Sequence, residues 1–427
     1  MPDYSKVEQS LVAMFSPNFK RQSDIKIALA DGAITKRHPF VTPSKPTRTR
    51  NRRVVYHCNG IDIFEEKVTD QFSRWTFAFP ADAALIAGWM AMNYGSALAP
   101  TGTPGDELQT VPINAAATTI TFSIEGRVET TALIAANANA VAIKAAIVAL
   151  EMFDTADVTI VGTVAAGFTI TYTGKYAKAN VPLATFSNGA AAAETTAGAN
   201  RIHAIARSTS VQLPLTSFII GWEEDSTFRK HKGFACESVI IEAKNREDLS
   251  CTVELVGRAD TEAVVGYVVP ACQTINPIEV DSCRIRVDGA YITEDLSSFR
   301  FERKNNIPVG DGAFPWADKN IGKIWRGPKP TETLSLSFYG AELHPQYIQA
   351  DEETKAAIIA DLGNPGDRYS IIAPEVKMTL GEPDLTFDND LRRSVVNITG
   401  TPHYNAGINA SSRGEANISQ ATAFLTA

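Results

Sequence analysis

Several features of catalytic and secreted proteins are missing from this sequence of 427 residues. No two cysteines stand in C-x-x-C spacing, which disfavours a zinc site. An odd number of cysteines without a pairing pattern predicts free thiols in a reducing compartment. The N-terminus lacks the basic start and apolar core of a signal peptide, so we expect the chain to be made in the cytoplasm. The five cysteines are Cys58, Cys236, Cys251, Cys272 and Cys283.

Catalytic motifs are also missing. The sequence has no G-x-S-x-G, no H-E-x-x-H, no Walker A motif and no G-x-G-x-x-G after a strand. The six histidines are scattered, and we expect His231, within RKHKG, to be a solvated loop residue. The residues Asp388-Asn-Asp390 lack the glycine and distal glutamate of an EF-hand loop, which favours a turn. We therefore predict no enzyme activity, no cofactor and no bound metal.

Long hydrophobic runs are absent as well. The most apolar stretch, residues 83–92, is too short to span a bilayer. With 44% hydrophobic and 21% charged residues, the composition is that of a globular protein, and the length predicts two or three domains. The formal net charge of −8 argues against a general nucleic-acid binder.

Acidic residues are missing from one segment, residues 32–61. Its prolines exclude a helix, and we expect an extended arm or long loop. Three interpretations stay open: a solvated loop, an arm that docks on an acidic neighbouring subunit, or a nucleic-acid contact. The last is disfavoured because no aromatic residues are interleaved to stack on bases. The basic residues are Lys36, Arg37, Lys45, Arg48, Arg50, Arg52 and Arg53.

Alternating apolar residues are abundant in the rest of the chain and predict many short strands. Helical patterns cover only residues 82–92 and 351–362 outside the segment discussed next, and both have an aspartate at the N-cap. This balance indicates a mainly β (α+β) protein of the β-sandwich class. The predicted strands are residues 53–57, 75–79, 216–222, 238–243, 250–256, 284–287, 298–303, 334–338, 376–380 and 393–399.

Residues 105–200 have a pattern of their own. Apolar residues alternate in TTITFSIEG and GFTITYTG, and between them Asn139 can cap a helix that carries Ile143, Ile147 and Leu150 on one face. Flexible segments rich in proline, glycine or alanine flank the unit. We expect an inserted ββαββ module. It closely resembles a small domain that recurs in tail and capsid proteins of tailed bacteriophages.

A second resemblance lies outside this module. Residues 234–260 and 295–308, with the closing VKMTL and SVVNITG, resemble the tail tube (major tail) proteins of long, flexible-tailed phages. The resemblance covers roughly residues 50–100 and 200–405. It implies a β-sandwich flanked by a helix that forms one sixth of a ring. Rings then stack through a long loop and a terminal arm around a DNA channel.

A weak internal repeat suggests two tandem sandwiches. Each half offers a strand, a helix and a strand pair that ends in glycine. Two such domains per chain would make trimeric, pseudo-hexameric rings, and one domain would need a hexamer. The expected division is residues 1–104 (arm, basic loop and start of tube domain one), 105–200 (inserted domain), 201–270 (rest of domain one) and 271–427 (domain two and C-terminal arm).

The resemblance also implies the location and the partners. The protein would be a virion tail component that contacts other copies of itself, the tape measure protein and phage DNA in the lumen, and the tail terminator and baseplate proteins. The inserted module could contact host surface polymers. A single-ring baseplate or tail-tip protein and a surface carbohydrate-binding adhesin are the alternatives. The expected inter-ring contact consists of Lys45, Arg48, Arg50, Arg52 and Arg53, which would meet acidic residues 223–225 or 351–353.

Overall fold

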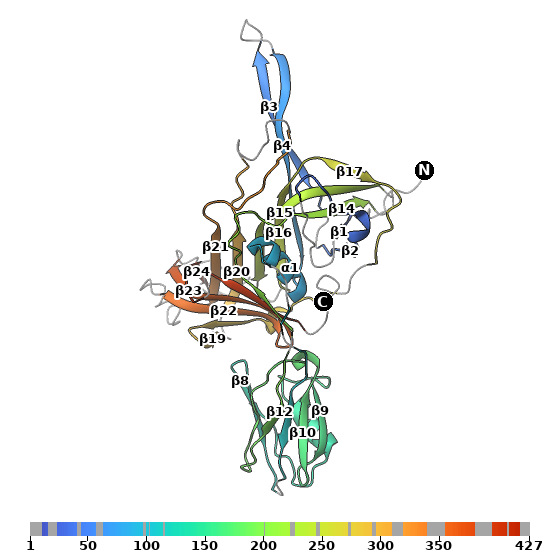
Figure 1. Ribbon diagram of the computed structural model, residues 1–427. Helices are drawn as coiled ribbons and strands as arrows, with labels where there is room; N and C mark the ends of the chain where they lie inside the picture. Colours follow the sequence, from blue (N-terminus) through green and yellow to red (C-terminus); the bar gives the residue numbers. More distant parts are fainter. Residues whose placement is uncertain are drawn as a thin grey trace, which may run out of the picture.

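The computed structural model describes residues 11–15, 24–40, 44–56, 63–96, 100–101, 103–113, 116–199, 201–222, 227–244, 248–271, 275–292, 296–309, 319–339, 355–380, 395–407 and 410–418. Within these ranges the chain is mainly β, as predicted, with two α-helices. Long antiparallel strands form a body, a hairpin leaves it at one end, and two smaller sheets lie at the opposite end (Figure 1). No described helix is long and apolar enough to cross a membrane.

One antiparallel sheet runs through the body. In pairing order its strands are β4 (Ile63–Pro80), β16 (Ser250–Gly257), β15 (Thr227–Lys244), β20 (Leu296–Lys304), β21 (Thr331–Tyr339), β24 (Val395–Pro402) and β23 (Asp367–Leu380). Apolar and polar residues alternate along them, so that one face is buried; Val253, Ile241 and Phe301 belong to that face.

Two of these strands are long enough to join further sheets. The first part of β15 pairs with β14 (Thr216–Trp222) and β17 (Thr261–Val264), and β14 continues to β1 (Leu11–Phe15) and β2 (Lys36–Arg37). The first part of β23 lies between β22 (Lys355–Asn364) and β25 (Arg413–Ile418). These lead on to β18 (Arg284–Val287) and β19 (Ala290–Ile292), and to β13 (Arg201–Ile205) and β5 (Pro100–Thr101). Two 3-10 turns, η3 (Asp31–Ala33) and η5 (Val280–Ser282), complete the body.

Helix α1 (Ala83–Tyr94) packs inside the body. The Asp82 side chain accepts hydrogen bonds from the backbone N–H groups of Ala84 and Leu85, and Gly95 ends the helix in the left-handed conformation, as the sequence predicts. All twelve residues of α1 are buried, whereas the sequence suggested a single apolar face. The helix is therefore covered on every side by the body's core.

The predicted second helix, residues 351–362, is wrong. Residues 351–354 lie outside the described ranges, and Lys355–Asn364 form strand β22. Ala356, Ile358, Ala360 and Leu362 are buried at alternate positions, which is strand periodicity. The chain then turns back through Pro365 and Gly366 into β23. The second flanking helix expected for a tandem repeat is thus absent at these described residues.

The other predicted strands of the body are present. Residues 216–222 and 284–287 match β14 and β18, and six other predicted segments fall within longer strands. The predicted strands 53–57 and 393–399 overlap β3 (Thr47–Tyr56) and β24, and their residues 57 and 393–394 lie outside the described residues. Residues 47–56, which were expected in part to be an irregular arm, form strand β3 (Thr47–Tyr56), paired with β4. Strands on both sides of residue 270 share one sheet, because β15 pairs with β20 over Ser238–Lys244.

The inserted sheets form a unit with its own core. One sheet has the order β12-β6-β10-β9, and the other β11-β7-β8. Asn139 caps helix α2, and Ile143 and Ile147 are buried, as predicted. The bounds are β6 (Leu108–Val111), β7 (Ile120–Ile124), β8 (Arg127–Thr130), α2 (Ala140–Val148), β9 (Val158–Thr163), β10 (Gly167–Tyr172), η4 (Gly174–Tyr176), β11 (Thr185–Phe186) and β12 (Ala193–Thr196).

Candidate assembly interface

The most prominent surface feature is the β3–β4 hairpin, which extends beyond the body (Figure 1). Before Gln71, β4 pairs with β3 alone among the described strands. Arg48, Arg50 and Arg52 are exposed on β3, and a β-bulge between Asn51 and Arg52 shifts the register. A two-stranded ribbon without a core is marginally stable in water, so a partner surface would stabilise it.

The second strand of the hairpin carries the acidic residues. Asn51 Nδ2 donates to Asp70 Oδ2 at 2.9 Å, and Glu65 and Glu66 stand opposite Val55 and Val54 in the ladder. A basic strand is therefore paired with an acidic one. Sequence reasoning located the basic segment but missed this pairing, although the acidic run directly follows it in the chain.

The base of the hairpin is fixed to the body through Gln71. Its backbone N–H donates to the Lys319 carbonyl at 2.7 Å, and its Nε2 donates to Asn320 Oδ1 at 3.0 Å. The guanidinium of Arg48 donates to Gln71 Oε1. The pKa of Arg48 is lowered, first by partial burial and then by the neighbouring charge of Arg50. These contacts hold the hairpin at a defined angle.

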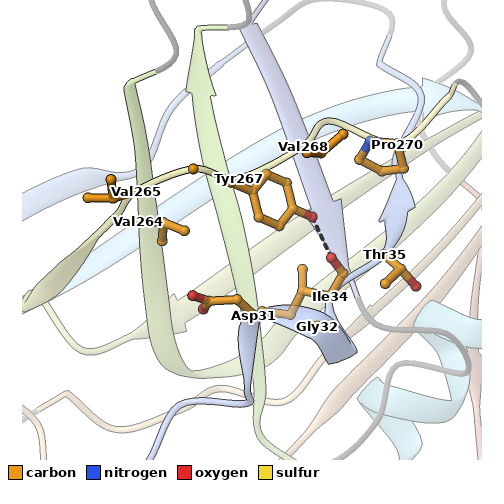
Figure 2. Close-up of a pocket in the computed structure, with 10 residues that line it drawn as sticks. Asp31, Gly32, Ile34, Thr35, Val264, Val265, Tyr267, Val268 and Pro270 are labelled. Carbon is orange, nitrogen blue, oxygen red and sulfur yellow. Dashed lines mark hydrogen bonds between the residues drawn. The ribbon is translucent and has the colours of Figure 1, made fainter.

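A hollow of about 260 Å³ lies on the body between η3 and the segment that follows β17 (Figure 2). The hydroxyl of Tyr267 donates to the Ile34 carbonyl and closes one side of the hollow. Val265 and Val268 at its edge are 94% and 85% exposed. Two large aliphatic side chains so exposed beside a concave surface are typical of an interaction site.

Ion pairs lie beside this hollow. Asp31 pairs with Lys230 at 2.7 Å, and Glu262 pairs with Lys232 at 2.6 Å. The two carboxylate side chains are 48% and 44% exposed, whereas both lysines are 13% exposed. The carboxylates are therefore the more exposed partners of these ion pairs.

The main sheet offers two strand edges. Between Trp75 and Pro80, β4 pairs only with β16 among the described strands. At the other end, residues 378–380 of β23 pair only with β24 within the same ranges. An unpaired edge is a template for another chain.

The solvent-facing side of this sheet is polar, and its arginines are neutralised. Arg300 pairs with Glu242 at 3.0 Å and with Glu302 at 2.9 Å. Arg74 pairs with Glu254 at 2.6 Å. Guanidinium groups that are already engaged bind phosphate less readily, because a phosphate would have to displace the carboxylate.

The residues predicted for the inter-ring contact lie on or next to β3. Lys45, Arg48, Arg50 and Arg52 are exposed, and Arg53 stands opposite Lys67 in the ladder. The acidic residues 223–225 and 351–353, and Asp388–Asp390, lie outside the described residues.

The histidine predicted to be solvated is instead buried. His231 lies on β15 and stacks on Phe218 with ring centroids 4.9 Å apart. Burial lowers its pKa to about 4. The flanking Arg229, Lys230 and Lys232 gave the segment a polar appearance, but alternation along a strand places the ring inside.

No group of three or more His, Cys, Asp or Glu side chains that could hold a metal ion occurs within the described ranges. A scan against protein-family models found no match, and a search of curated proteins found none.

Proposed function

We propose that this chain is a virion structural protein that polymerises into stacked rings and forms the tail tube of a long-tailed phage, the conduit for DNA ejection. The observation that carries the proposal is the β3–β4 hairpin, which extends from the body with exposed arginines and, before Gln71, pairs with no other described strand. Such a hairpin gains stability by docking on the next ring. The sequence resemblance to tail tube proteins supports this role.

The docking surface for the hairpin is the hollow beside η3. Its exposed valines offer apolar area, and its carboxylates complement Arg50 and Arg52 of the next subunit. This assignment replaces the acidic segments expected from the sequence. Charge complementarity sets register and speeds association, and the buried apolar area supplies affinity.

Rings close through the two edges of the main sheet, with the β4 edge of one subunit pairing with the β23 edge of the next. The pairing of β15 with β20 supports trimeric rings. It joins a strand of the first half of the chain to a strand of the second half, in the way that strands of two neighbouring subunits would pair in a hexamer. Hexameric rings are the alternative, and they are favoured by the finding that the described residues 355–362, expected to belong to the second flanking helix, lie in strand β22 instead. The polar face with its paired arginines would line the channel and let the tape measure protein and DNA slide.

The remaining partners follow from this role. The tube ends would contact the tail terminator and baseplate proteins, and the inserted sheets, at the end of the body opposite the hairpin, could reach host surface polymers. A single-ring baseplate or tail-tip protein would use the same edges without stacking, and a carbohydrate-binding adhesin would not use them at all. In the proposed role the protein is not an enzyme and is located in the virion.

Charge reversal on the hairpin tests the inter-ring contact. The variant Arg50→Glu with Arg52→Glu leaves Arg48 and its Gln71 contact in place. We expect an unchanged melting temperature and rings that fail to stack into tubes in electron micrographs. The control variant, Lys144→Glu with Arg413→Glu, reverses two charges far from the hairpin in sequence and should form normal tubes. Normal tubes from the hairpin variant would exclude this contact.

A further inference from the structure

The inserted sheets contact the body through the β7–β8 turn. Glu125 and Gly126 form this turn with φ of 50° and 80°, the left-handed conformation of a tight hairpin. Glu125 Oε1 accepts a hydrogen bond from Arg368 Nη1 at 2.7 Å, and its other oxygen lies 4.0 Å from Arg284 Nε. The carboxylate is 16% exposed, so this ion pair between the two units is largely shielded from water.

The body's side of this contact carries an excess of positive charge. The buried Asp361 pairs with Arg286 at 2.7 Å and lies 4.0 Å from Arg368, and Arg284 stands opposite it in the β18–β22 ladder. Glu125 therefore supplies the second negative charge of the cluster. When the inserted sheets move away, three guanidinium groups are left with a single described carboxylate.

A second contact lies at the β22–β23 turn. The backbone N–H of Gly366 donates to the Lys175 carbonyl at 3.2 Å, beside η4 of the inserted sheets. A Cβ atom at position 366 would come within 2.0 Å of the Ala177 carbonyl oxygen. Gly366 is not among the residues with positive φ, so the close approach, and not the backbone conformation, requires glycine here.

The covalent connection between the two units is narrow by comparison. It consists of the chain leaving β5 and returning to β13, with one bridge between Gly105 and Ala199. A connection of only two strands allows the inserted unit to rotate relative to the body unless other contacts prevent it.

We infer that the Glu125 turn is an electrostatic latch, which holds the inserted sheets against the body and releases them when its ion pairs are removed. The released unit would swing on its two-strand connection while both cores stay folded. This inference concerns one chain and does not rest on the proposed function.

Hydrogen exchange of the full-length, unassembled chain tests the latch, with the peptide spanning residues 364–368 as the reporter. Two variants break the contact in different ways: Glu125→Gln removes the charge, and Gly366→Ala introduces the clash with Ala177. Glu151→Gln is the control, since this residue lies on the same unit and is 90% exposed. At 0.1 M salt we expect exchange to accelerate by about tenfold in both variants and not in the control.

The same variants should show a larger radius of gyration in small-angle X-ray scattering with an unchanged melting temperature. Because the ion pair is largely shielded from water, raising the salt to 1 M should change exchange in the wild type far less than Glu125→Gln does. Wild-type exchange in Glu125→Gln would overturn the latch. Opening by Gly366→Ala alone would also overturn it, because the contact would then be steric and not electrostatic.

Discussion

At the scale of single residues, His38 shows how burial fixes a protonation state. Its ring is 2% exposed, its Nδ1–H donates to the Pro39 carbonyl at 2.7 Å, and its Nε2 accepts from Trp89 Nε1 at 3.0 Å. A proton on Nε2 would remove the acceptor that Trp89 needs. Burial accordingly lowers the pKa of His38 from 6.5 to about 3.

This shift predicts acid sensitivity. Below pH 6.5 the unfolded chain binds a proton at His38 that the folded chain takes up only near pH 3, so stability is complete above pH 6.5 and falls as the pH drops. The His38 contribution should fall by about 2–3 kcal/mol between pH 7 and pH 4.5. Denaturant unfolding of His38→Gln should show a correspondingly flatter pH dependence than the wild type. A variant at the exposed His403 should keep the wild-type dependence, and an unchanged slope in His38→Gln would contradict the assignment.

Residue-level reasoning from sequence succeeded where the chemistry is local. Asp82 and Asn139 were predicted as helix caps because a side-chain oxygen reaches a backbone N–H only two or three residues away. It failed at His231, whose environment is set by Phe218 on a neighbouring strand. Local pattern cannot supply that partner.

At the scale of elements, α1 depends on its N-cap more than a surface helix would. Asp82 Oδ1 accepts from Ala84 and Leu85, and Oδ2 accepts from the Asn276 N–H at 2.9 Å, with no more than 4% of the residue exposed. One carboxylate thus satisfies the helix start and a loop from the second half of the chain, and water cannot replace it.

Asp82→Ala should therefore reduce the free energy of unfolding by about 2–3 kcal/mol. Asp82→Asn keeps the oxygen that caps the helix and loses the acceptor for Asn276, so it should lose about half as much. Urea unfolding followed by tryptophan fluorescence would measure both, because Trp89 lies within α1. A loss below about 0.5 kcal/mol in the alanine variant would show that the cap is dispensable.

The largest error of the sequence prediction concerns the segment that forms β22, which was predicted to be a helix. The segment AAIIADL has apolar residues both at helical spacing and at alternate positions, and an apparent cap favoured the helix. The decisive signal was Asn364-Pro365-Gly366-Asp367, a turn between two apolar runs, which joins β22 to β23 as a hairpin. Such a short apolar run is ambiguous until its partner strand is known.

At the scale of the whole molecule, the sequence predicted the mainly β class, because alternation and turn residues are local properties. It could not predict that β15 pairs with β20, or that the hairpin carries basic and acidic strands side by side. The first of these features depends on pairing between distant segments, and the second on a hairpin whose first strand was expected in part to be an irregular arm. The proposed assembly rests on both. The account therefore depends on whether the edges and the hairpin engage other copies of the chain.

Electron microscopy of the purified, concentrated protein tests this directly. The account predicts hollow tubes of uniform width with regular cross-striations, and end-on views with three chains per ring. Six chains per ring would support the tube and show that the ring is a hexamer and not a trimer. Isolated rings that never stack would favour a baseplate protein, and featureless monomers at every concentration would contradict the central claim.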